Sequence, residues 1–170
     1  MYDIMLRIAG TANDSIVDGP GIRFTIFTQG CPHNCAGCHN PQTHRFDGGT
    51  LVAIDSILEQ IFGNPLLDGV TFSGGEPFCQ AEALYYMGLE IKKHGLNIIT
   101  YTGFTFEYLI EHSDSKNFYK ELLSVCDYIV DGRFEIDKKD YTLKFKGSSN
   151  QRIIDCKRSL AENAAIETEL

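Results

Sequence analysis

Three cysteines stand close together in this chain, at Cys31, Cys35 and Cys38. Their spacing, C-x3-C-x2-C, offers three thiolates, which are soft anionic ligands for zinc or for an iron–sulfur cluster. A structural zinc site almost always takes four protein ligands, whereas a cluster held by three cysteines leaves one iron free for chemistry. The segment therefore predicts a metal centre, and the spacing alone leaves open which metal it binds.

Zinc is the alternative that these residues allow. A zinc knuckle needs a fourth ligand, either His33 or His39 in the same stretch or a cysteine from elsewhere in the chain. We assign neither histidine as a metal ligand. The remaining cysteines fall outside any ligand spacing, and we expect them to be buried or partly buried free thiols; they are Cys79, Cys126 and Cys156.

Composition and charge restrict the class of protein. A chain of 170 residues with 43% hydrophobic and 22% charged residues is typical of a soluble globular protein, and we expect a single domain over residues 1–170. The formal net charge of -8 argues against a nucleic-acid partner, which binds through clustered Lys and Arg. No apolar run reaches the ~20 residues of a membrane span, and the N-terminus does not resemble a secretory signal. We therefore expect a cytoplasmic protein without a membrane partner, whose thiols stay reduced.

Two segments depart from this average composition. Four lysines gather at Lys138, Lys139, Lys144 and Lys146. A solvated face is the simpler interpretation of this cluster, and a docking patch for an acidic partner surface is the alternative. The polar tail after about residue 156 is rich in Ala and Glu, and we expect it to fray.

Hydrophobic periodicity predicts strands that alternate with helices. Strands are expected at 4–8, 23–28, 67–72, 96–100, 126–130 and 141–145, and helices at 55–62, 81–94, 105–111 and 117–124. This order indicates an α/β fold with a mostly parallel sheet, in which right-handed crossovers bring the loops after the strands to one edge. Roughly five parallel strands leave an open partial (β/α) barrel instead of a closed barrel of eight strands.

The cysteine loop follows the strand at 23–28, and Gly74-Gly75-Glu76-Pro77 follows the next core strand. Together these two motifs resemble those of the radical S-adenosylmethionine superfamily, whose fold is the open partial barrel expected above. The resemblance implies that Cys31, Cys35 and Cys38 bind a 4Fe-4S cluster. It also implies that S-adenosylmethionine binds the free iron of that cluster.

The resemblance also implies where the cofactor is contacted. Gly74 and Gly75 would expose backbone groups to the amino group of S-adenosylmethionine, and Glu76 would orient their loop. Arg133 is a further candidate, with a surface turn as the alternative. The full set of implied cofactor contacts is Gly37, Cys38, His39, Gly74, Gly75, Glu76 and Asp131, the last toward the ribose or carboxylate.

Three further segments narrow the resemblance. Residues 17–23 (VDGPGIR), 39–43 (HNPQT) and 146–155 (KGSSNQRIID) resemble the activating enzymes of glycyl-radical enzymes, in the branch that serves anaerobic ribonucleotide reduction. That branch implies a glycyl-radical reductase subunit as the partner and a flavodoxin-like electron donor. One electron cleaves the sulfonium carbon–sulfur bond, and the resulting 5'-deoxyadenosyl radical takes a hydrogen atom from a glycine α-carbon. This scheme needs no catalytic side chain, because the cofactor does the chemistry.

Other functions compete with this interpretation. The chain is alternatively an activase of another glycyl-radical enzyme, such as pyruvate formate-lyase, or a radical enzyme that acts on a small molecule. An open barrel suits a macromolecular substrate better than a small one. A non-catalytic zinc-binding interaction module is the alternative from another class.

Overall fold

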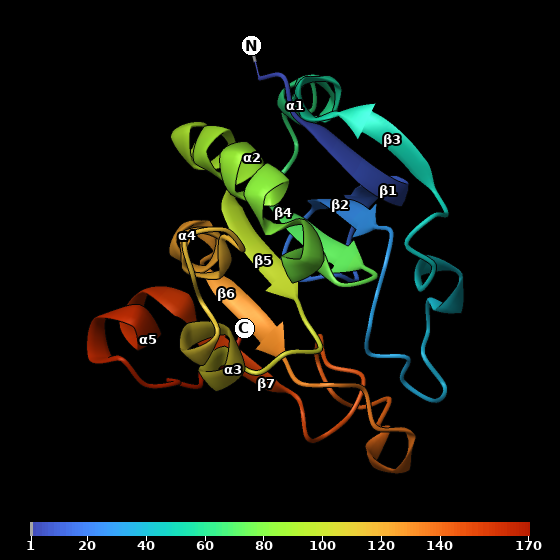
Figure 1. Cartoon of the computed structure of the whole chain (residues 1–170), viewed down its shortest axis with the longest axis vertical. Coiled ribbons are helices and arrows are strands. Elements are labelled where there is room, and N and C mark those ends of the chain that lie inside the picture. The colour runs from blue at the N-terminus through green and yellow to red at the C-terminus, as the bar shows by residue number, and fades with distance from the viewer. Residues whose placement is uncertain (1) are drawn as a thin grey trace.

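A computed structural model describes residues 2–170. Its centre is an open sheet of seven strands in the order β3-β1-β2-β4-β5-β6-β7, with β3 and β7 at the edges (Figure 1). The strands are β1 (Met5–Ser15), β2 (Arg23–Thr28), β3 (Thr50–Ala53), β4 (Gly69–Gly74), β5 (Asn97–Tyr101), β6 (Tyr128–Asp131) and β7 (Arg152–Asp155). The α/β fold with an open sheet is confirmed.

The four central strands β2, β4, β5 and β6 are parallel to one another. β1 runs antiparallel to both of its neighbours, and β7 runs antiparallel to β6. Because the central strands are parallel, their carboxyl ends lie at one edge of the sheet. The loops after residues 28, 74, 101 and 131 all begin at that edge.

Five helices cover one face of the sheet: α1 (Ile54–Phe62), α2 (Ala81–Lys93), α3 (Phe106–Glu111), α4 (Tyr119–Val125) and α5 (Cys156–Glu162) (Figure 1). The buried apolar side chains of α1, α2, α3 and α4 contribute to the core between the two layers. In α1 the predicted stripe is confirmed, because Ile54, Ile57, Leu58 and Ile61 are all buried. Over residues 2–170 no helix has the length and apolar content needed to cross a membrane.

The N-terminal strand is longer than the apolar pattern predicts. The predicted strand covers residues 4–8, whereas β1 has 11 residues and lies inside the sheet, between β3 and β2. Its second half, Gly10 to Ser15, has no apolar alternation and is held by irregular backbone pairing with β2. Hydrophobic periodicity does not report such pairing, and it also misses the short, mostly exposed β3.

The prediction of a strand at 141–145 is wrong. These residues form turns instead, because the Asp140 carboxylate accepts hydrogen bonds from the Thr142 backbone N–H at 2.9 Å and the Thr142 hydroxyl at 2.6 Å. Phe145 then takes a left-handed conformation with φ of 61°. The alternation of Tyr141, Leu143 and Phe145 thus belongs to a loop.

The C-terminal segment also differs from the expectation of a frayed tail. Asp155 caps the start of α5 by accepting a hydrogen bond from the Arg158 backbone N–H at 3.0 Å. After α5 the chain returns to β7, where the Thr168 N–H donates to the Ile153 carbonyl at 2.9 Å. Backbone pairing gives this polar segment a place in the structure that its composition does not predict.

Candidate active site

The loops at the carboxyl ends of β2, β4, β5 and β6 surround one cavity of about 450 Å³, a size typical of small-molecule sites. The cavity is lined by the cysteine loop, the glycine loop after β4, the turn after β5, the segment after β6 and part of the 17–23 segment. Its lining includes Asp18, Cys31, Cys35, Cys38, His39, Gly74, Gly75, Tyr101, Thr102, Gly103, Gly132, Phe134, Gly147 and Gln151.

The three cysteines of the predicted metal centre all line this cavity, and all are partly buried. Burial raises the pKa of the Cys31 and Cys35 thiols above the ordinary value. The loop that carries them is fixed at its start, where the Gly30 N–H donates to the Thr43 carbonyl at 2.7 Å. The cysteines therefore lie on an anchored segment at the edge where the parallel strands end.

Backbone N–H groups face all three sulfur atoms. Such donors stabilise negative charge on sulfur, which is the charge that a thiolate carries when it binds metal. The donors are those of His33 and Asn34 to Cys31, that of Phe134 to Cys35, and that of Asn40 to Cys38 at an N···S distance of 3.4 Å.

This donor set fits an iron–sulfur cluster. Within residues 2–170 no three Cys, His, Asp or Glu side chains are gathered closely enough to hold one metal ion. A cluster makes a different demand, because each of its cysteines binds a separate iron. Three partly buried thiols around one cavity, each with an N–H donor, meet that demand.

Gly74 and Gly75 line the cavity directly opposite backbone of the cysteine strand and loop. Gly74 has φ of 90°, and a Cβ atom there would lie 2.5 Å from the Thr28 nitrogen. A Cβ atom on Gly75 would lie 2.4 Å from the Gly30 carbonyl oxygen. Only glycine allows the two loops to approach this closely, and it leaves backbone groups of the loop open to the cavity.

Glu76 does not line the cavity, although the sequence places it among the implied cofactor contacts. Its side chain is fully buried, and Oε1 lies 2.6 Å from His33 Nε2 and 2.8 Å from both the Thr102 hydroxyl and the Gly103 nitrogen. Oε2 accepts a hydrogen bond from the Phe78 N–H at 2.9 Å. Contacts on both carboxylate oxygens fit the loop-orienting role that the resemblance implies for Glu76, and its direct contact with the cofactor stays a prediction.

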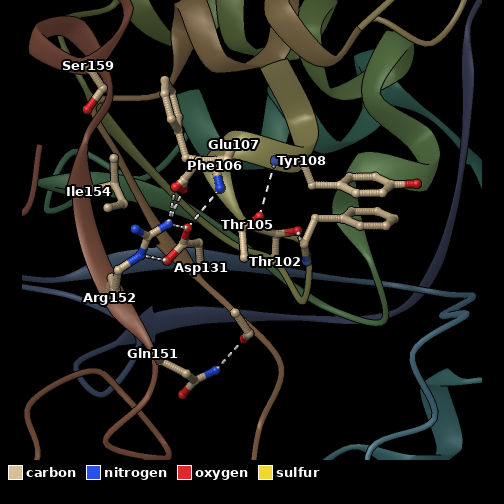
Figure 2. A network of polar contacts seen from close by, with 12 residues as sticks. Thr102, Thr105, Phe106, Glu107, Tyr108, Asp131, Gln151, Arg152, Ile154 and Ser159 are labelled. Atoms are coloured by element: carbon tan, nitrogen blue, oxygen red, sulfur yellow. Dashed lines mark hydrogen bonds and ion pairs between the residues drawn. The ribbon is translucent and has the colours of Figure 1, made fainter. Parts of the chain in front are cut away.

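Asp131 also lies outside the cavity lining, with its side chain beside Arg152 (Figure 2), and its expected contact with the cofactor stays a prediction. Its carboxylate is 1% exposed and pairs with Arg152 at 2.6 Å, while Oδ2 also accepts the Phe106 N–H at 2.8 Å. The next residue, Gly132, lines the cavity instead. Arg133 is exposed and outside the lining, as the surface-turn alternative predicts.

Two of the remaining predicted contacts differ in their placement. His39 lines the cavity, and its ring centroid is 5.1 Å from that of Phe134. Gly37 lies outside the lining, with φ of 72°. A Cβ atom there would come within 2.6 Å of Ile136, so glycine is needed at this turn for packing.

Comparison with known proteins agrees with this site. A family model described as a 4Fe-4S single cluster domain matches residues 17–154. The anaerobic ribonucleoside-triphosphate reductase-activating protein of Haemophilus influenzae is 32% identical over 148 residues, which cover 81% of this chain and 90% of the relative. The chain belongs to this family of radical S-adenosylmethionine activating proteins. Its cofactors are a 4Fe-4S cluster and S-adenosylmethionine, and it is an oxidoreductase.

The chain is also similar to pyruvate formate-lyase-activating enzymes. The pyruvate formate-lyase-activating enzyme of Clostridium pasteurianum is 36% identical over 120 residues, covering 65% of this chain and 50% of that enzyme. Its counterpart in Staphylococcus aureus is 33% identical over 155 residues, covering 86% of this chain and 59% of that enzyme. Among solved structures, the crystal structure of QueE from Escherichia coli has a TM-score of 0.48 and 20% identity, over 58% of this chain and 52% of that one.

The 17–23 segment, which resembles that of other family members, packs against the buried guanidinium of its own Arg23. Arg23 is fully buried and donates hydrogen bonds to the Thr71 hydroxyl at 2.7 Å and to the Pro20 carbonyl at 3.1 Å. A Cβ atom on Gly19 would lie 2.8 Å from the Arg23 side chain. Burial lowers the pKa of Arg23 to about 10, so the guanidinium still carries its charge at neutral pH. The motif is thus needed to fold this segment over Arg23, which places Asp18 in the cavity lining.

The polar side chains of the 146–155 segment form hydrogen bonds within their own turn and with the segment after β6. Gln151 (Figure 2) accepts the Gly147 N–H at 2.8 Å through its side-chain oxygen. Its side-chain nitrogen donates to the Gly132 carbonyl at 3.0 Å. The Ser148 hydroxyl is buried and accepts the Glu135 N–H at 3.2 Å. These hydrogen bonds give the polar side chains of the segment a role in capping its turn.

The four clustered lysines have different surroundings. Lys146 lines the cavity, whereas Lys138 pairs with Glu135 at 3.4 Å and Lys139 lies 4.5 Å from the centre of the Tyr141 ring. Exposed pairs of this kind contribute little, as expected for a solvated face.

The cysteines without a predicted metal role lie outside the cavity lining. Cys126 and Cys156 are buried, and burial raises the pKa of the Cys126 thiol to about 12. Cys79 is exposed, which differs from the expected burial.

Sequence reasoning missed several residues of the site. The sequence assigns no role to His33 or to the three residues after the strand expected at 96–100, yet all four line the cavity; the three are Tyr101, Thr102 and Gly103. Their position after the third parallel strand was the available signal, because that edge is where ligands bind in α/β folds.

Proposed function

We propose that this chain activates an anaerobic ribonucleoside-triphosphate reductase by generating a glycyl radical on it. One observation carries the proposal: the three-cysteine loop and the Gly74-Gly75 loop face the same cavity from adjacent strands. The extent of the match supports the choice of target. The chain covers 90% of the reductase-activating relative but 50% of the Clostridium pyruvate formate-lyase-activating relative.

Each loop has a distinct part in this proposal. Cys31, Cys35 and Cys38 hold the 4Fe-4S cluster, and backbone groups of Gly74 and Gly75 bind the methionine end of S-adenosylmethionine. When bound and reduced, the two cofactors supply homolytic cleavage of the sulfonium carbon–sulfur bond and removal of a hydrogen atom from a glycine α-carbon. The protein positions the reactants, and no side chain acts as an acid or base.

The partner is a protein segment. The sheet does not close on itself, since β3 and β7 are its edges, and the lining of the cavity includes Leu143 and the exposed Val17. An extended loop of the glycyl-radical subunit enters there and brings its glycine to the cofactor. A flavodoxin-like protein delivers the single electron to the cluster.

Electron paramagnetic resonance tests this proposal. The anaerobically reconstituted and reduced protein is mixed with S-adenosylmethionine and the reductase subunit, with a Cys35→Ala variant in parallel. We expect a glycyl-radical doublet on the reductase with the wild-type protein and none with the variant. A cluster signal that responds to S-adenosylmethionine without any doublet would exclude this target.

Activation of a pyruvate formate-lyase is the second candidate, favoured by the 36% identity of the Clostridium relative. The same mixture with pyruvate formate-lyase in place of the reductase discriminates the two. We expect a doublet on the reductase alone.

A further inference from the structure

His33 lies inside the cysteine loop, between Cys31 and Cys35, yet its side chain is only 4% exposed. Its Nε2 atom is 2.6 Å from Oε1 of Glu76, whose side chain is fully buried. A polar pair withdrawn from water this completely is costly unless its hydrogen bonds are satisfied. The arrangement of this pair therefore needs a structural reason.

The hydrogen-bond network fixes which atom carries the proton. Oε1 of Glu76 is also 2.8 Å from the Thr102 hydroxyl and 2.8 Å from the Gly103 backbone N–H. The backbone N–H can only donate, so Oε1 acts as an acceptor. His33 Nε2 then carries a hydrogen and donates it to the carboxylate, which makes a short, charge-assisted bond.

The space around the imidazole is closed on the side of β5. A Cβ atom on Gly103 would lie 2.4 Å from the His33 ring, so this position accepts only glycine while the ring is present. The Phe104 ring meets the imidazole edge to face, at 4.6 Å between centroids and 77° between planes. One side chain from the cysteine loop thus connects the loop after β4 with the loop after β5.

We propose that His33 is a positioning residue, which sets the cysteine loop against the Gly74-Gly75 loop so that S-adenosylmethionine contacts both. Glu76 directly follows Gly75, so the His33–Glu76 bond acts one residue away from the glycine backbone. The inference rests on the proposed placement of S-adenosylmethionine. Without the bond, the three thiolates still hold the cluster, but its free iron and the glycine backbone no longer keep one fixed separation.

The test uses the reconstituted holoprotein and three variants. His33→Leu removes the donor at similar volume, His33→Gln keeps an N–H donor, and His94→Leu removes a histidine that stacks on Phe62, outside the cavity lining. We measure iron and sulfide content and the dissociation constant for S-adenosylmethionine. We also measure how the paramagnetic signal of the reduced cluster changes when S-adenosylmethionine is added.

We expect His33→Leu to keep the cluster, to weaken binding of S-adenosylmethionine about tenfold and to lose most of the spectral change. His33→Gln should recover most of both, and His94→Leu should match the wild type. Wild-type binding and spectra in His33→Leu would overturn the proposal, as would a Gln variant no better than the Leu variant.

A fourth variant covers the case in which His33→Leu assembles no cluster. Glu76→Gln leaves the cysteine loop intact but weakens the same bond by removing the acceptor's charge. We expect weaker binding of S-adenosylmethionine with full iron content, and a wild-type dissociation constant would overturn the proposal. None of these readouts includes the reductase, so a failure to activate the reductase and a failure of positioning are distinguishable.

Discussion

Asp131 and Arg152 lie directly opposite each other in the antiparallel pairing of β6 with β7, and their side chains form an ion pair of 2.6 Å. The same guanidinium pairs with Glu107 of α3 at 2.5 Å, while Asp131 accepts the N–H of Phe106 at the start of that helix. Two strands and a helix are therefore joined at the point where the chain turns into the cavity at Gly132.

Substitution Arg152→Met should lower the free energy of unfolding by about 3 kcal/mol, because it leaves the buried Asp131 carboxylate without its partner. Urea unfolding monitored by circular dichroism measures this loss. The matched control is Lys92→Met, which breaks an exposed pair with Asp127 at 2.7 Å and should cost less than about 1 kcal/mol. Equal losses in the two variants would contradict a special role for the buried pair.

The Glu107 pairing should appear in the pH dependence of stability. The hydrogen bond from Arg152 lowers the pKa of Glu107 below the ordinary value of 4.5. A lowered pKa in the folded state stabilises the protein above the ordinary value, and the contribution is lost as pH falls through the folded-state pKa. The stabilities of the wild type and of Glu107→Gln should therefore differ at about pH 6, and the difference should shrink as the pH falls below 4.5 through the lowered pKa. A difference that stays constant over this range would show that the charge is not responsible.

The main elements of the fold follow from local patterns that the sequence displays. The bounds of the strand at 23–28 and of helix α2 were predicted almost to the residue. Each has a regular pattern of apolar residues and is followed by a glycine within two residues of its end. β3 and the second half of β1 were missed, since they depend on backbone pairing between distant segments. A local pattern does not contain that information.

The site divides in the same way. Residue type and spacing are enough to predict the roles of the three clustered cysteines and of the Gly74-Gly75 pair. Only cysteine supplies a thiolate, and only glycine has a backbone without a Cβ atom. Asp131 and Glu76 carry carboxylates, which often contact ligands. Here both carboxylates instead bind partners within the protein, Asp131 with Arg152 and Glu76 with His33. These partners lie 21 and 43 residues away in sequence, so only the tertiary structure identifies them.

Substitution Gly75→Ala should disturb the cavity, because the added Cβ atom would lie 2.4 Å from the Gly30 carbonyl oxygen and 2.9 Å from that of Thr43. Both neighbours are backbone, so the loops must separate, at a cost of about 1–3 kcal/mol. We expect weaker binding of S-adenosylmethionine, measured by equilibrium dialysis, together with a lower unfolding temperature.

The control for this change is Gly10→Ala in β1, where a Cβ atom meets nothing within 4 Å. That variant should bind S-adenosylmethionine as the wild type does. If Gly75→Ala also binds normally, the two loops do not need their close approach.

The six cysteines should separate into two groups when the iron and acid-labile sulfide of single Ala variants are measured after anaerobic reconstitution. Removing Cys31, Cys35 or Cys38 takes one ligand from a cluster that has only three, and we expect less than about a tenth of the wild-type iron to remain. Removing Cys126 deletes a buried thiol 3.1 Å from the Thr100 hydroxyl, so we expect full iron content and a loss of about 1 kcal/mol in stability.

Loss of iron from the Cys79, Cys126 or Cys156 variant would show that a thiol outside the cavity takes part in binding. Zinc in place of iron in the wild-type protein would show that the three-cysteine loop holds a different metal.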